Sequence, residues 1–135
     1  MIVDFDPRHV RAMRLQGGDV AQEQVSDEDL VALKSAGPAV TMIVGRPVAA
    51  AGVINLPDGS LLWAYLDESA GRHMVAIFRA AQRIVEVATR PVYATVAGGF
   101  AQGHRLLLLL GFALDRELPE YGPDGRDHAL YVRNT

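Results

Sequence analysis

Two periodicities divide this chain into predicted strands and helices. From residue 39 onward, three short apolar runs are separated by two strong turn signals. The runs are 39–45, 47–56 and 60–66, and the turns are Gly45-Arg46-Pro47 and Pro57-Asp58-Gly59. This spacing predicts three consecutive antiparallel strands. Across 72–88 the apolar positions instead recur every three or four residues, which predicts an amphipathic helix that covers the sheet.

Start and stop signals predict the remaining elements. The stretch "MIVDF" predicts a short edge strand, followed by a helix of about two turns with Asp6 as its N-cap, and Ser26 marks the start of a second helix that ends at Gly37. The C-terminal part predicts a strand, a helix and a closing pair of strands, in that order. Their ranges are 90–98, 100–112, 113–118 and 128–134.

The order of these elements predicts a mixed α/β (α+β) fold. Its sheet would be mostly antiparallel, with about six to seven strands, and four helices would flank it. The strands at 60–66 and 90–98 are joined through the helix at 72–88, so they are expected to form a parallel pair with a right-handed crossover. The N-terminal and final strands are expected at the edges, where a second copy of the chain could pair and form a homo-oligomer.

Composition narrows the functional classes. The chain has 135 residues, of which 50% are hydrophobic, so 1–135 is expected to be one globular domain. A net charge of −3 argues against nucleic acid as a partner, and the absence of cysteine excludes disulfides, thiolate metal ligands and cysteine nucleophiles. No histidines and carboxylates fall at ligand spacing, so no metal is expected. No apolar run reaches the roughly 18 residues of a membrane span, and a cytoplasmic location is expected.

Two stretches, "AGRHMVAIFRA" at 70–80 and "GHRLLLLLGF" at 103–112, together with the element order, resemble the GNAT acyltransferase superfamily. In that family a turn of pattern R/Q-x-x-G-x-G/A after the central strand holds the pyrophosphate of acetyl-CoA. Gly71 fits the pattern, whereas Glu68 replaces a basic or amide residue and His73 replaces a small one. The resemblance implies acetyl-CoA as cosubstrate. It would contact Leu66, Gly71, Arg72, His73, Met74 and Leu107.

The same resemblance places Leu107 where many members carry the tyrosine that protonates the departing thiolate. Leucine cannot donate a proton, so the usual general acid is missing. Glu68, or a water held by Tyr65, is a candidate base, and His104 is a candidate acid or base one helical turn before Leu107. The alternatives are ordinary roles: His104 as a partly exposed histidine, and Tyr65 with Trp63 as packing under a helix.

Two functions remain open at this point. The first is an N-acetyltransferase that transfers acetyl from acetyl-CoA to an unknown amine. The second is a catalytically degenerate interaction protein, because the chain also resembles small GNAT-like proteins of tailed phages and prophages, among them an internal virion protein. Its partner would then be another protein, in the host cytoplasm or in a phage particle.

Overall fold

The computed structural model describes residues 1–17, 22–23, 25–97, 100–121 and 125–135. They form one seven-stranded sheet in the order β1-β2-β3-β4-β5-β7-β6, in which only β4 and β5 are parallel. The strands are β1 (Ile2–Asp4), β2 (Ala39–Val44), β3 (Arg46–Leu56), β4 (Gly59–Leu66), β5 (Val92–Ala97), β6 (Ala113–Leu118) and β7 (His128–Arg133). The predicted mixed, mostly antiparallel sheet is confirmed.

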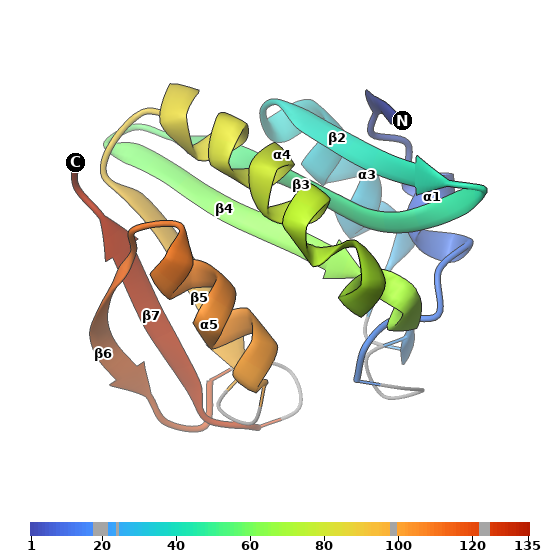
Figure 1. The fold of residues 1–135 in the computed structure, drawn as a ribbon. Coiled ribbons are helices and arrows are strands. Elements are labelled where there is room, and N and C mark those ends of the chain that lie inside the picture. The colour runs from blue at the N-terminus through green and yellow to red at the C-terminus, as the bar shows by residue number, and fades with distance from the viewer. Residues whose placement is uncertain (18–21, 24, 98–99, 122–124) are drawn as a thin grey trace.

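Four α-helices among the described residues cover the two faces of the sheet (Figure 1). They are α1 (Pro7–Arg11), α3 (Asp27–Ala36), α4 (Met74–Val87) and α5 (Ala101–Leu109), and a 3₁₀ helix η1 (Glu68–His73) leads into α4. Figure 1 shows α4 and α5 on one face and α1 and α3 on the other. The predicted set of four flanking helices is therefore confirmed.

Each face of the sheet has its own core. Under α4 and α5, buried residues of both helices pack against β5 and β7, with Val85 and Val92 fully buried. Under α1 and α3, a second cluster contains Phe5, Val10 and Leu30 and packs against Trp63 and Tyr65 of β4. Successive residues of a strand point to opposite faces, so β4 contributes to both cores.

Close approach of the chain at the start of β4 requires a glycine. A Cβ at Gly59 would lie 2.4 Å from the Pro91 carbonyl oxygen, and the next residue, Ser60, donates its N–H to that oxygen at 3.0 Å. The Ser60 hydroxyl also donates to the Thr89 carbonyl at 2.9 Å. These contacts hold β4 and β5 together at one end only.

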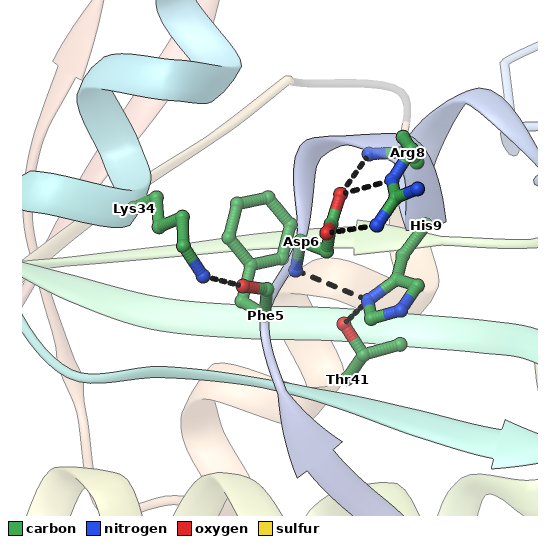
Figure 2. A network of polar contacts seen from close by, with 6 residues as sticks. All are labelled: Phe5, Asp6, Arg8, His9, Lys34 and Thr41. Carbon is green, nitrogen blue, oxygen red and sulfur yellow. Dashed lines mark hydrogen bonds and ion pairs between the residues drawn. The ribbon is translucent and has the colours of Figure 1, made fainter.

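A polar network fixes α1 against β2 and α3 (Figure 2). Asp6 caps the helix by accepting the Arg8 N–H at 2.8 Å, and His9 Nδ1 accepts both the Asp6 N–H at 3.1 Å and the hydroxyl of buried Thr41 at 2.7 Å. Lys34 Nζ donates to the Phe5 carbonyl at 2.6 Å. These contacts position the segment that continues from α1 toward β4.

Three details differ from the sequence-based expectations. The first helix is α1, Pro7–Arg11, and has five residues instead of about two turns. The helix expected at 72–88 begins at Met74, because the residues before it adopt the tighter η1 geometry. The final strand β7 is not an edge, because β6 pairs with its outer side, so the two edges of the sheet are β1 and β6.

Candidate functional site

The parallel strands β4 and β5 separate soon after they meet. They pair only at Ser60 with Val92 and at Leu61 with Tyr93, although β3 pairs with β4 along its whole length. Beyond Leu61, no β5 partner for β4 is found in the described part of the chain. The two strands therefore diverge and leave one edge of β4 open (Figure 1).

The far end of that open edge is covered by the chain that follows α1. Leu15 forms an isolated antiparallel bridge with Asp67, the Gln16 N–H donates to the Leu66 carbonyl at 2.9 Å, and the Glu68 N–H donates to the Arg14 carbonyl at 2.8 Å. Between the two paired ends, β4 residues 62–65 have no strand on this side among the described residues. Ser60 and Leu66 direct their backbone groups to this side, so by alternation the N–H and C=O groups of Leu62 and Ala64 face the gap, whereas those of Trp63 and Tyr65 face β3.

A cleft of about 410 Å³ fills this gap. Its lining comes from β4, β5, α5 and the segment before α3, and none of the described residues that line it carries a formal charge. They are Leu15, Gln16, Val25, Leu62, Trp63, Ala64, Tyr65, Leu66, Ala94, Thr95, Val96, Phe100, Gly103, Leu106 and Leu107. Because Trp63 and Tyr65 pack with the α1–α3 core and Leu62 with the α4–α5 core, the cleft is lined from both faces of the sheet.

Asp67 organises the turn that follows β4. Its carboxylate is 1% exposed and accepts the Arg14 N–H at 2.7 Å, the Ser69 N–H at 2.9 Å, the Ser69 hydroxyl at 2.6 Å and the Arg46 guanidinium. Burial raises the pKa of this carboxyl, but the hydrogen bonds from Ser69, Arg14 and Arg46 outweigh it and hold the pKa at about 2, below the ordinary value of 3.8.

The backbone N–H groups at the start of this turn are already hydrogen-bonded within the protein. The amides of Glu68, Ser69 and Ala70 donate to the Arg14 carbonyl, the Asp67 carboxylate and the Asp67 carbonyl, respectively. The 3₁₀ geometry of η1 directs each following amide to a carbonyl three residues earlier. Gly71 is exposed, has no positive φ, and a Cβ there would meet no atom within 4 Å. The glycine is therefore not required by the fold, and the amides at 68–70 are engaged within the protein.

The other residues that the resemblance assigns to the cosubstrate are divided between the cleft, a second groove and the turn before α4. Leu66 and Leu107 line the cleft and are 8% and 4% exposed. Arg72 is exposed on η1, and His73 is the N-cap of α4 without a side-chain capping bond. Met74 lines a second groove, of about 310 Å³, between α4 and α5. Leu106 lines both hollows, so groove and cleft adjoin.

The three candidate catalytic residues are separated by the fold. Tyr65 lines the cleft. Burial of its ring is the main cause, and the nearby Asp29 carboxylate a second one, of a pKa raised above the ordinary value of 10. Glu68 is exposed at the start of η1 and does not line the cleft. His104 does not line it either, and its Nδ1 lies 2.8 Å from the hydroxyl of Tyr131 on β7. Of the three, only Tyr65 is in position to meet a ligand in the cleft.

Two residues that are not among the predicted site residues belong to the cleft. Gln16 lies in a polar connection between two helices and carries no motif. Trp63 shares a strand face with Tyr65, and the sequence leaves open whether that face packs under a helix or lines a cleft. Gln16 Oε1 and Trp63 Nε1 are nevertheless buried polar atoms with no hydrogen-bond partner in the described part of the chain. A buried donor and acceptor without partners are unusual in a folded protein.

The described residues offer neither a metal site nor a membrane-spanning helix. They contain no group of three or more histidines and carboxylates placed to hold a metal ion. No helix among them has the length and apolar character needed to span a membrane.

No protein-family model matches the chain, and no curated protein matches it by sequence. Solved structures do match its fold. Ard1 from Thermoplasma volcanium superposes with a TM-score of 0.77 at 17% identity, covering 100% of this chain and 97% of that one. The ribosomal-protein-S18-alanine N-acetyltransferase from Escherichia coli gives 0.75 at 14% identity, covering 99% and 92%.

A ribosomal-protein-alanine N-acetyltransferase from Brucella melitensis gives a TM-score of 0.68 at 17% identity, covering 100% of this chain and 99% of that one. These likenesses extend over whole chains, so they concern the complete arrangement of sheet and helices and not one motif. At such low sequence identity they establish the fold alone. The chain has the fold of the GNAT N-acetyltransferases.

Proposed function

We propose that this chain binds an acyl-CoA, with acetyl-CoA as the expected form, and transfers the acyl group to an amine in the cleft between β4 and β5. The observation that carries this proposal is the open edge of β4 at 62–65, which faces an uncharged cleft of about 410 Å³. An extended ligand with amide groups, such as the pantetheine arm of CoA, can bond to such an edge as an added strand would.

The residues present fit the arm better than they fit the pyrophosphate. The apolar lining from Leu62, Leu66 and Leu107 suits the methylene groups of the arm, and the β4 backbone suits its amides. The turn amides at 68–70 are already bonded within the protein. Arg72 and His73, at the positive end of α4, would meet the phosphates with their side chains, while Met74 and Arg105 in the adjoining groove would flank the rest of the nucleotide.

The chemistry supplied by an acyl-CoA is an activated thioester: a C–N bond forms to the amine, the C–S bond breaks, the amine loses a proton and the thiolate gains one. The contribution of the chain is orientation of the two reactants in an uncharged cleft. Tyr65 is protonated at neutral pH, as any tyrosine with an ordinary pKa of 10 is, and burial and Asp29 raise its pKa further, so its hydroxyl can donate a hydrogen bond or hold a water but is a poor base. Leu107 supplies no proton.

Filling the cleft tests this proposal. Ala64 lines it and is exposed, so Ala64→Phe should block acetyl-CoA binding in calorimetric titration without disturbing the core. Ala76→Phe is the matched control, because Ala76 is exposed on α4 and lines neither the cleft nor the groove. Acetyl-CoA at ten to a hundred times its Kd should stabilise the wild-type chain by about 1.4 to 2.7 kcal/mol. Absence of any binding at millimolar acetyl-CoA would refute the proposal.

A second candidate is a non-catalytic protein that uses this fold to bind a partner, such as a component of a phage particle. The closed turn at 68–70 and the buried leucine at position 107 favour it. A thiol-release assay with a panel of amines separates the two candidates. Acetyl-CoA binding with release of CoA thiol only in the presence of an amine supports the transferase, whereas no release with any amine supports the second candidate.

A further inference from the structure

The elements η1, α4 and α5 carry a positively charged surface on an acidic protein. Their exposed arginines, called here the arginine face, are Arg72, Arg79, Arg83 and Arg105. The acidic residues of these elements are Glu68 and Glu86, so this surface has an excess of positive charge although the net charge of the chain is −3. Within the described ranges, no arginine of this face forms an ion pair. These charges are free to meet a partner of opposite charge.

An apolar groove lies within the same surface. It has a volume of about 310 Å³ and separates α4 from α5, which lie on one face of the sheet (Figure 1). Two of the apolar side chains that line it, Val75 and Leu109, are 67% and 65% exposed. Arg79 and Arg83 follow Val75 at intervals of four residues, so they continue its row along α4. Exposed apolar side chains bordered by arginines are typical of a surface that binds another protein.

The groove adjoins the cleft that is proposed to hold the pantetheine arm. Leu106 lines both hollows, so an arm in the cleft reaches the surface beside the arginine face. The turn at this point offers little to a nucleotide diphosphate, because the amides at 68–70 are bonded within the protein and Glu68 adds a negative charge. A single phosphodiester carries one negative charge, which Arg72 alone can balance.

We infer that the arginine face docks an acidic carrier protein, whose acylated 4′-phosphopantetheine arm enters the cleft through the groove. This inference rests on the proposed function and names a donor class for the same site. A C–N bond forms to the amine and the C–S bond of the thioester breaks. The proton that the amine loses goes to the sulfur, which stays attached to the carrier protein. Docking raises the effective concentration of the arm and supplies the affinity that the closed turn withholds from a free nucleotide.

The experiment compares acetyl donors that share the arm. Acetyl-pantetheine, acetyl-CoA and the acetylated form of a bacterial acyl carrier protein are each titrated calorimetrically into the full chain. We expect the acetylated carrier protein to bind at least about tenfold more tightly than acetyl-pantetheine at low salt, and to lose most of this advantage at about 0.5 M salt. The carrier protein without its arm should bind more weakly than the acetylated form, because it docks without filling the cleft.

Charge reversal on α4 separates docking from binding of the arm. Arg79 and Arg83 line neither the cleft nor the groove. Arg79→Glu and Arg83→Glu should each weaken the carrier protein about threefold to fivefold and leave acetyl-pantetheine unchanged. Arg116→Glu is the matched control, because it makes the same change of charge at an exposed side chain on β6, outside the arginine face. It should change the affinity for the carrier protein less than twofold.

The inference is overturned if the acetylated carrier protein binds no more tightly than acetyl-pantetheine, or if Arg79→Glu weakens it no more than Arg116→Glu does. Tighter binding of a single-stranded RNA than of the carrier protein to the arginine face would also overturn it. Should a variant fail to fold, the comparison of donors on the wild-type chain still decides. Failure of the proposed function has a different signature, because neither acetyl-CoA nor acetyl-pantetheine would then bind, whereas failure of this inference alone leaves both binding.

Discussion

Replacing Asp67 by asparagine should destabilise the protein strongly at neutral pH. The carboxylate accepts four hydrogen bonds at a position that is 1% exposed, and one of the donors is the Arg46 guanidinium. Asparagine has nearly the same shape but no charge, and its NH₂ group would face donors. The turn after β4, and the segment bonded to it at Arg14, would lose their common anchor.

The magnitude follows from the pKa. Asp67 has a pKa of about 2 in the folded chain and an ordinary value of 3.8, and a difference of this size corresponds to about 2.5 kcal/mol. Because the folded-state pKa is lowered, this stability is fully present above the ordinary pKa and is lost as the pH falls through about 2. Asp67→Asn should therefore cost about 2.5 kcal/mol at pH 7 and progressively less below pH 4.

Urea unfolding at pH 7, 5, 3 and 2 measures this difference. The other carboxylates titrate in both proteins, so the difference between the two unfolding free energies isolates Asp67. Asp58→Asn in the exposed turn between β3 and β4 is the control and should change the free energy by less than about 0.5 kcal/mol at each pH. A cost below about 1 kcal/mol at pH 7, or a cost that does not shrink with acid, would refute the role assigned to Asp67.

Three other substitutions test neighbouring features. Gly59→Ala should cost more than about 1 kcal/mol in urea unfolding, since its Cβ would clash with the Pro91 carbonyl. Gly71→Ala, whose Cβ meets no atom within 4 Å, should cost nothing and should stabilise the chain by up to about 1 kcal/mol. Equal costs would contradict this account of the β4–β5 contact. His73→Gly should weaken acetyl-CoA binding in calorimetric titration, because it removes one of the two side chains that are proposed to meet the phosphates at the start of α4. Tighter binding would show that the imidazole crowds the phosphates instead of binding them.

The sheet could be predicted because its signals are local. Alternating apolar residues, the hairpin turns at Gly45 and Gly59, and the period of the helix over 72–88 each depend on residues close together in sequence. The position of β7 inside the sheet could not be read in this way. It depends on which of two six-residue strands pairs with β5, and that pairing joins residues far apart in the sequence.

The turn after β4 shows where local reasoning stops. The sequence identified Asp67 or Ser69 as a helix cap, and Asp67 is the cap of η1. The partners that bury its carboxylate, Arg14 and Arg46, lie 53 and 21 residues away and carry no pattern that links them to it. Without those contacts the stretch could equally have presented free amides to a phosphate.

His104 illustrates the limit of helical spacing. A residue three positions before Leu107 lies about 60° around the helix from it, which is near enough to suggest a shared face. In the structure Leu107 is buried and lines the cleft, while His104 is turned toward the Tyr131 hydroxyl on β7 and does not line it. Which side chains of a helix face a cleft depends on how the helix packs in the folded chain, and the periodicity of the sequence does not determine this.

One carboxylate connects the two sides of the proposed site. Asp67 holds the backbone of Arg14, and the segment that follows covers the end of β4 and places Gln16 in the cleft. The same carboxylate binds the Ser69 amide, which would otherwise be free to meet a phosphate. The contact that builds this end of the cleft therefore engages backbone donors of the turn after β4. An acyl-CoA bound here must draw its affinity mainly from the arm along β4 and from the side chains at the start of α4.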